Sequence, residues 1–280
     1  MKFNVSSKLQ YDVLSSSTII LNIHALRSPQ QTVLEERFWI DPYVKWEELI
    51  MPNSENRFIK IEIDKKTNIA IDYMALVDTS YKIISQKKIR ELSVNELSPE
   101  IFPYLYPSRY CQSDMLYRLA NNMFGKIEHP YEKVIALTNW IHENVAYLSG
   151  STDAQTSAYD TVTQQAGVCR DFAHLGIALC RALTIPARYF TGYAFQLNPP
   201  DFHACFEAYL NGEWILFDAT KLAPLNGMVK IATGRDAADT AIANIFGEVN
   251  FLSMEVKCEL ADENFSPFFN DERKMGISFL

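Results

Sequence analysis

The chain has 280 residues, of which 48% are hydrophobic, so it is long enough for one large domain or two modest ones with a real core. Its net charge of −8 lies wholly in residues 111–280, because residues 1–110 carry 14 basic and 14 acidic side chains. Phosphate backbones and anionic membranes need clustered Lys and Arg, so we expect neither nucleic acid nor membrane as a partner.

The five cysteines, at positions 111, 169, 180, 205 and 258, are odd in number and widely spaced, and no two form a C-x-x-C pair. This spacing disfavours a disulfide framework and a structural zinc site. The first residues contain no apolar stretch typical of a secretion signal, and no run approaches ~18 apolar residues. We therefore expect a reducing, cytoplasmic setting. No phosphate loop or H-E-x-x-H motif is present, so we expect no cofactor and no metal.

The first hundred residues have the alternating pattern of β-strands. Residues 17–26 and 58–64 are strand-like, and residues 69–77 follow after the polar turn 65–68, which suggests a hairpin. Short strands with polar turns predict a β-rich, sandwich-like domain over residues 1–108.

Pro99, Pro103 and Pro107 mark a linker, after which the hydrophobic period becomes helical. Ser113 or Asp114 could cap one helix, and Pro130 suits the first turn of another. Their apolar positions are Met115, Leu116, Leu119 and Met123 in the first helix and Val134, Leu137, Ile141 and Val145 in the second. With no internal repeat, residues 109–280 are predicted to form a single α+β domain.

A third helix is predicted to begin at Cys169 and to end at residues 184–186. It is apolar nearly all round, so it belongs in the middle of a domain, with its first residue at a surface or cleft. Backbone N–H groups at a helix N-terminus favour negative charge, which suits a thiolate or a developing oxyanion. A small buried cysteine remains the alternative, because free Cys is often buried.

Residues 203–210 and 213–218 flank Asn211-Gly212, a strong hairpin signal. A two-residue turn pairs Leu210 with Glu213, which places His203, Cys205 and Asp218 on one face. His203 and Asp218 are then diagonal neighbours whose side chains can meet, whereas a slip of one residue would separate them. A base oriented by an acid is what a nucleophilic thiol requires.

Six short segments resemble, in order, those of the bacterial transglutaminase-like proteins: PSRYC at residues 107–111, GVCRDFAHL at 167–175, IPARYFTGY at 185–193, HA at 203–204, FDAT at 217–220 and IATGRDAAD at 231–239. The β-rich front also resembles the N-terminal domain often found in such proteins. The resemblance implies a papain-like α+β fold in which Cys169 is the nucleophile, His203 its base and Asp218 the orienting acid.

The implied chemistry is acyl transfer on a peptide or protein substrate. The Cys169 thiolate attacks a carbonyl, and His203 passes the proton to the departing amine. Water as acceptor gives a protease or amidase, and an amine gives a transglutaminase. We favour hydrolysis, since the chain shows no calcium-loop signature. A non-catalytic binding or scaffold domain of the same fold is a further alternative, and oligomeric state is not predicted.

Two positions depart from the family pattern. Cys205 stands where many members have Trp, and Ala219 replaces the usual Pro. The backbone N–H of Cys169 is one candidate oxyanion donor, and Gln164 and Trp140 are candidates for the second.

The remaining polar residues are expected to be structural, apart from Tyr193, which we expect near the thiol. His174 is predicted to be a hydrogen-bonded core residue. Arg170 and Asp171 should anchor the helix start, and a loop network should join Arg235, Asp236 and Asp239.

Overall fold

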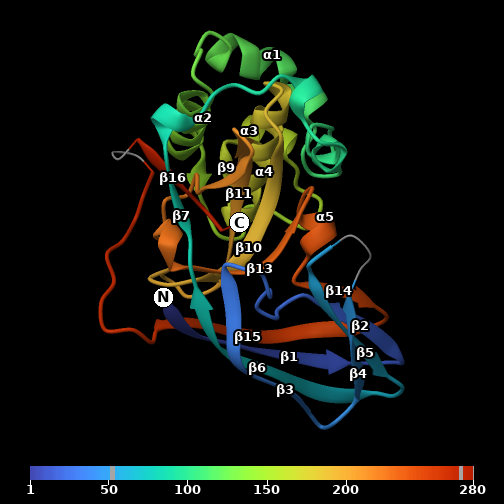
Figure 1. Ribbon diagram of the computed structural model, residues 1–280. Helices are drawn as coiled ribbons and strands as arrows, with labels where there is room; N and C mark the ends of the chain where they lie inside the picture. Colours follow the sequence, from blue (N-terminus) through green and yellow to red (C-terminus); the bar gives the residue numbers. More distant parts are fainter. Residues whose placement is uncertain (51–53, 271–273, 280) are drawn as a thin grey trace.

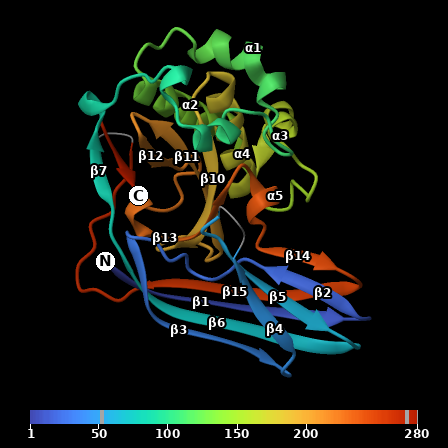
Figure 2. The same cartoon turned by 45° about the vertical axis from the view of Figure 1, so that its right-hand side comes forward.

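The computed structural model describes residues 1–50, 54–270 and 274–279. A β-rich part lies at one end of the molecule, and an α+β part with all the α-helices lies at the other (Figures 1 and 2). The expected fold class, an α+β core preceded by a β-rich, sandwich-like part, is therefore confirmed.

The β-rich part contains two four-stranded sheets, ordered β15-β1-β6-β3 and β14-β2-β5-β4. Alternate side chains of β1, β2, β5 and β6 are buried and share one hydrophobic cluster, which is the pattern of a sandwich. The strands are β1 Lys2–Val13, β2 Ser17–Leu21, β3 Gln31–Asp41, β4 Lys45–Ile50, β5 Arg57–Ile63, β6 Thr67–Thr79, β14 Ala243–Phe246 and β15 Val249–Leu260.

The predicted hairpin of residues 58–64 and 69–77 is wrong. Both runs are strands, but β5 pairs with β2 and β4, whereas β6 pairs with β1 and β3. The polar turn between them carries the chain from one sheet to the other. A turn and two alternating strands fit this crossing as well as they fit a hairpin, because both strands bury one face in either case.

Strands from the end of the chain complete both sheets of the sandwich. β14 pairs with β2, and β15 pairs along nearly the whole of β1. The sequence predicts one α+β domain over residues 109–280, which would include β14 and β15. The division at residue 108 stays a prediction. The return ties the two parts together, since each β-rich sheet has one strand from the far end of the sequence.

The α+β part has an antiparallel sheet ordered β12-β11-β10-β13 with helices around it. Its strands are β10 Ala187–Ala194, β11 Phe202–Leu210, β12 Glu213–Phe217 and β13 Met228–Gly234. The helices are α1 Ser113–Phe124, α2 Pro130–Asn144, α3 Ala158–Gln164, α4 Cys169–Ala182 and α5 Ala237–Thr240. Short pairs are formed by β7 Lys82–Ser85 with β16 Met275–Ser278, and by β8 Ala146–Tyr147 with β9 Ala166–Gly167. Single 3₁₀ turns are η1 Gln86–Lys88, η2 Val94–Glu96, η3 Pro99–Tyr104 and η4 Leu225–Gly227.

Helix α4 is the buried helix that the sequence predicted, and it packs directly on β11. A Cβ atom added at Gly176 would lie 2.5 Å from the Phe206 ring, so only glycine permits this close approach. The helix therefore presents its first residue, Cys169, at a fixed position relative to β11.

The apolar face predicted for α1 is only partly correct. Leu116 is buried, but Met115 and Met123 are 55% and 40% exposed, and the helix instead buries Ala120 and Phe124. Methionine counts as apolar in the helical pattern, but its flexible side chain does not have to be buried. The pattern therefore predicted too many buried positions on this face of α1. The core positions predicted for the second helix are all buried, although Val145 lies just after the end of α2.

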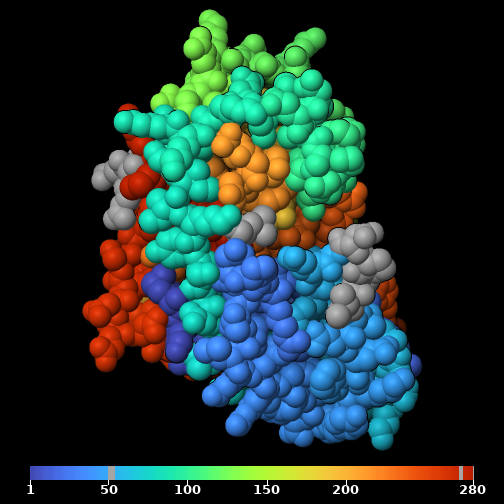
Figure 3. Space-filling model, viewed as in Figure 1, coloured from blue at the N-terminus to red at the C-terminus, as the bar shows by residue number. Residues whose placement is uncertain are grey.

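The other face of the sheet is covered by the end of the chain, whose Phe268, Ile277 and Phe279 pack against Phe190 and Leu216. Figure 3 shows the N-terminal part in blue at the lower end, with the teal segment that follows it continuing onto the α+β part. Among the described residues, the chain crosses between the two parts after β6, before β14 and after β15.

Candidate active site

Cys169 is the first residue of α4, and its side chain is partly exposed. The Asp171 carboxylate caps the helix by accepting a hydrogen bond of 2.9 Å from the backbone N–H of Val168. That carboxylate is held by the Arg170 guanidinium at 3.0 Å and by the Thr152 hydroxyl at 2.8 Å. The predicted anchoring role of Arg170 and Asp171 is confirmed, and it fixes the backbone on which the thiol stands.

The predicted hairpin register is confirmed. Leu210 pairs with Glu213, and the ladder continues in the same register to Phe206 and Phe217. Asn211 and Gly212 have φ of 55° and 87°, as a type I′ turn requires. Asp218 comes directly after β12 and reaches the His203 ring, as the predicted pairing requires.

His203 and Asp218 meet in the interior. The His203 Nε2 atom lies 2.8 Å from Asp218 Oδ2, and the two residues are 1% and 6% exposed. The other carboxylate oxygen accepts hydrogen bonds from the backbone N–H of Thr220 at 2.8 Å and from its hydroxyl at 2.7 Å. The carboxylate is therefore held from both sides, and it fixes the orientation of the ring.

Burial by itself lowers the pKa of His203, but the Asp218 carboxylate outweighs that effect and holds this pKa well above its usual value. Burial by itself raises the pKa of Asp218, yet His203 and Thr220 bring it below its usual range. The pair is thus biased toward an imidazolium facing a carboxylate at neutral pH.

The second ring nitrogen of His203, Nδ1, is buried and makes no ordinary hydrogen bond with the described residues. Cys169 is close enough for its thiol to contribute to the raised pKa of His203. The structure therefore brings together all three of the residues that the sequence singled out, with the ring between a thiol and a carboxylate.

Cys205 lies on the same face, as predicted, and brings a second thiol close to Asp218. Burial raises its pKa to about 12. One donor atom each from His203, Cys205 and Asp218 lie within 4.8 Å of one another, which is close enough for a metal ion, and all three residues are buried. The His203–Asp218 hydrogen bond already joins two of these three residues through Nε2 and Oδ2.

His174 is a core residue, as expected. It is fully buried, its Nε2 accepts a hydrogen bond of 3.1 Å from the backbone N–H of Ala237, and its ring stacks on Tyr110 at 5.0 Å. The expected loop network is also present: Arg235 pairs with Asp239 at 2.9 Å. In the same loop the Asp236 carboxylate caps α5 through the backbone N–H of Ala238 and also binds that of Tyr110.

Tyr193 does not fit its expected place near the thiol. Its hydroxyl donates to the carbonyl oxygen of Ile23 at 2.8 Å and lies 3.1 Å from the Ser7 hydroxyl, both in the β-rich part. Side chains alternate along β10, and that of Tyr193 points toward the neighbouring sandwich. The position of the sandwich relative to β10 could not be predicted from the sequence.

Two further residues of the site, Tyr147 and Asp201, were not predicted from the sequence. The electrostatic environment of the Tyr147 hydroxyl includes Cys169, His203 and Asp201. Asp201 precedes β11, and burial raises the pKa of its carboxyl. Neither belongs to a recognisable motif, and Tyr147 lies three residues after the end of α2.

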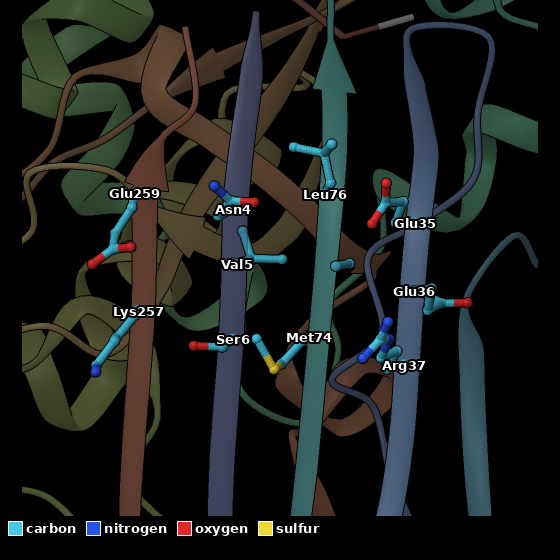
Figure 4. A pocket seen from close by; sticks show the side chains of 11 residues that line it. Asn4, Val5, Ser6, Glu35, Glu36, Arg37, Met74, Leu76, Lys257 and Glu259 are labelled. Carbon is cyan, nitrogen blue, oxygen red and sulfur yellow. The ribbon is translucent and has the colours of Figure 1, made fainter.

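Two larger hollows lie elsewhere on the described surface. One, of about 320 Å³, lies over the outer face of β15, β1, β6 and β3, where Figure 4 shows Asn4, Ser6, Met74 and Lys257. The other, of about 510 Å³, lies between the sandwich and β13–α5. Neither is lined by Cys169, His203 or Asp218, so the candidate site is separate from both.

A thiol at the start of a buried helix, beside a histidine that a carboxylate orients on an adjacent antiparallel sheet, is the arrangement of side chains on which Cys-His-Asp chemistry depends. Comparisons with known proteins identify the family. Residues 1–100 match the bacterial transglutaminase N-terminal domain, and residues 117–219 match the transglutaminase-like superfamily.

The chain belongs to this superfamily. A crystal structure of a candidate cysteine protease from Cytophaga hutchinsonii is 55% identical in sequence, with a TM-score of 0.97 over 100% of this chain and 98% of that one. Uncharacterized protein ML0607 of Mycobacterium leprae is 25% identical over 69% of this chain and 74% of its own length. The periplasmic domain of TgpA from Pseudomonas aeruginosa is 16% identical, covers 77% of this chain and 76% of its own, and has a TM-score of 0.39. Family membership and the first of these structures support cysteine-based catalysis as the general chemistry.

Among the helices that the structure describes, none is long and apolar enough to cross a membrane.

Proposed function

We propose that this protein hydrolyses a peptide or amide bond through a thioester on Cys169, with His203 as the base and Asp218 as the orienting acid. The observation that carries the proposal is the buried 2.8 Å contact between His203 and Asp218, next to a partly exposed thiol at the start of α4. Acyl transfer requires a nucleophile, a proton carrier and an orienting group in one place, and the proximity of these three side chains supports the proposal.

The proposed reaction begins with His203 holding the proton that leaves Cys169. The thiolate forms a bond to the carbonyl carbon, and the carbonyl electron pair moves onto oxygen. When that pair returns, the C–N bond breaks and the amine takes the proton from His203. Water then attacks the thioester and His203 accepts its proton; the C–S bond breaks, Cys169 takes that proton back, and the carboxylic acid leaves. The raised pKa of His203 supports its role as proton donor to the amine.

Iodoacetamide alkylation tests the nucleophile. We expect Cys169 to be alkylated much faster than Cys258, whose pKa is raised by burial, and we expect His203→Ala to remove the difference. Peptide mass spectrometry distinguishes the two thiols. Alkylation of Cys169 no faster than that of an exposed free thiol would refute the proposal and favour a non-catalytic binding or scaffold domain.

A peptide library incubated with the protein and a primary amine distinguishes the acyl acceptors. Cleaved peptides support peptide hydrolysis, deamidated glutamines support amide hydrolysis, and amine adducts support protein-glutamine amine transfer. Hydrolysis is contradicted if adducts form while cleavage and deamidation do not.

A cytoplasmic location belongs to the same proposal. Its support is that the five cysteines are all free thiols and that Cys111, Cys180 and Cys205 are buried. Fractionation of cells that carry the native protein tests it, since recovery in the periplasmic fraction would contradict it.

A further inference from the structure

Asp201 places a carboxylate on the same side of β11 as the His203 ring. It immediately precedes the strand, and the residue between them, Phe202, turns its ring to the other side, where it packs on Tyr193 at 5.2 Å. Side chains two residues apart on a strand share a face, so those of Asp201 and His203 point the same way. Their Cα atoms are about 7 Å apart at the ordinary rise of a strand.

This carboxylate lies at the entrance to the space around the thiol. Asp201 and Cys169 both belong to the electrostatic surroundings of the Tyr147 hydroxyl. The charge of His203 acts in turn on Asp201. Asp201 is exposed, Tyr147 is 47% exposed and Cys169 is partly exposed. A substrate that reaches the thiol therefore passes beside Asp201.

Asp201 is an acid without a basic partner in the part of the chain that the structure describes. One of its oxygens accepts a hydrogen bond of 2.6 Å from the backbone N–H of Phe202. Arg170, next to the nucleophile in the sequence, is held instead by the fully buried Asp171 at 3.0 Å. Burial raises the pKa of Asp201, whereas the Phe202 N–H and the charge of His203 oppose this effect and favour the carboxylate. The entrance thus carries an unpaired negative charge.

We propose that Asp201 recognises a positive charge on the leaving side of the substrate, so that the protein selects peptides whose released part begins with Lys or Arg. The inference rests on the proposed acyl transfer at Cys169. His203 gives its proton to the departing amine, so the amine nitrogen comes within hydrogen-bond reach of the ring. Asp201 lies two residues along the same face, a distance that an extended Lys or Arg side chain spans.

The charge of the α+β half of the chain acts in the same direction. Residues 111–280 carry the remaining 12 basic and 20 acidic side chains, so the whole net charge of −8 lies in the half that holds the thiol. Such a field attracts cations from a distance, but salt screens it beyond ~8 Å at physiological ionic strength. Asp201 differs because it acts on a group that is already in the site.

The first test measures the charge beside the thiol in the full-length protein and needs no substrate. Two methanethiosulfonate reagents of similar size, one with a trimethylammonium and one with a sulfonate group, react with Cys169, and peptide mass spectrometry gives each rate. The ratio of the two rates cancels any change in the reactivity of the thiol itself. At an ionic strength of about 0.15 M only nearby charges contribute.

We expect Asp201→Asn to lower the ratio of the cationic to the anionic rate by about 10-fold. The cation loses an attraction and the anion loses a repulsion, each of about 3-fold. Asp114→Asn is the matched control, because it changes an exposed aspartate of α1, a helix whose Asn121 contacts Ala182 at the far end of α4. It should leave the ratio unchanged.

The second test compares matched substrates. Peptides that the protein cleaves are made with Lys or with norleucine directly after the cleaved bond, since norleucine has nearly the shape of lysine without its charge. We expect kcat/KM to be about 10-fold higher for the Lys peptide. Asp201→Asn should abolish this preference and change the rate for the norleucine peptide by less than about 2-fold.

Each other outcome is decisive. If Asp201→Asn leaves the ratio of reagent rates unchanged, the inference is wrong and the proposed function stands. If the ratio falls but both peptides are cleaved equally, Asp201 selects nothing and the inference is also wrong. A preference for Lys before the cleaved bond would contradict the assignment to the leaving side. If the ratio falls and no peptide is cleaved, the proposed function fails and the substrate assignment fails with it. Circular dichroism and thermal melting of each variant verify that it is folded.

Discussion

Asp218→Asn removes the charge beside His203 with almost no change in shape. In the unaltered protein the carboxylate lies 2.8 Å from Nε2 of a buried ring and outweighs the effect of burial on its pKa. Without that charge, burial dominates, so the pKa of His203 falls and the ring is neutral at pH 7. The proposed function requires an imidazolium beside Cys169, and we expect Asp218→Asn to remove it.

The size of the effect follows from the contact. Two unit charges 2.8 Å apart attract by about 6 kcal/mol at an effective dielectric constant of about 20. Both charges are delocalised over two atoms, so we take about half of this energy. It corresponds to a change of about 10² in the equilibrium between imidazolium and neutral imidazole. The side-chain amide that replaces the Asp218 carboxylate has only one oxygen. While that oxygen accepts hydrogen bonds from Thr220, the amide nitrogen faces His203 and cannot accept from Nε2–H, so the His203 tautomer with the proton on Nδ1 is favoured.

The assay is the rate of Cys169 alkylation by iodoacetamide as a function of pH. At pH 6 we expect Asp218→Asn to be alkylated about 10²-fold more slowly than the unaltered protein. The difference should shrink toward pH 10, where thiols ionise without assistance. Asp201→Asn is the matched control. It removes a nearby carboxylate whose oxygen accepts from the backbone N–H of Phe202, and it should change the rate by only a few-fold. Equal rates for Asp218→Asn and the unaltered protein at pH 6 would refute the reasoning.

Two further predictions concern stability. Glu207 is fully buried between Arg188 and Lys230, so Glu207→Ala should lower the free energy of unfolding by about 3–5 kcal/mol in urea titrations, and a loss below about 1 kcal/mol would contradict this. Burial raises the pKa of Glu36, but hydrogen bonds from Arg57 outweigh it and bring this pKa to about 2. Its stabilising contribution is present above its unfolded value of about 4.5 and is lost as the pH falls through about 2. Glu36→Gln should therefore reduce the acid dependence of unfolding between these values, and an unchanged pH profile would show that this carboxylate contributes nothing.

Local signals in the sequence were sufficient for the chemistry at the hairpin. Asn211-Gly212 requires a two-residue turn, the turn fixes the register, and the register places His203 and Asp218 on one face. The start of α4 at Cys169 was predictable for a similar reason, since apolar spacing is local, whereas the helix ends at Ala182 and not at the predicted residues 184–186. Together these two elements predicted Cys169 as a nucleophile, and the resemblance to the family then implied acyl transfer as its chemistry.

Long-range pairing was not predictable. The turn after β5 is compatible with a hairpin and with a crossing between sheets, and only the packing of the sandwich chose the crossing. In the same way, no local sequence pattern predicts that β14 pairs with β2 or that β15 pairs with β1. Tyr193 was misplaced because its partners, Ser7 and Ile23, lie in that sandwich.

The sequence by itself determined which groups could react, because residue type, turn geometry and helix period are properties of short segments. The tertiary structure decided which of those groups meet. It placed Cys169 beside His203 through the close contact of Gly176 with Phe206, and it brought Tyr147 to the same place through two short paired strands. Contacts between segments distant in sequence depend on how surfaces pack, and no local pattern contains that information.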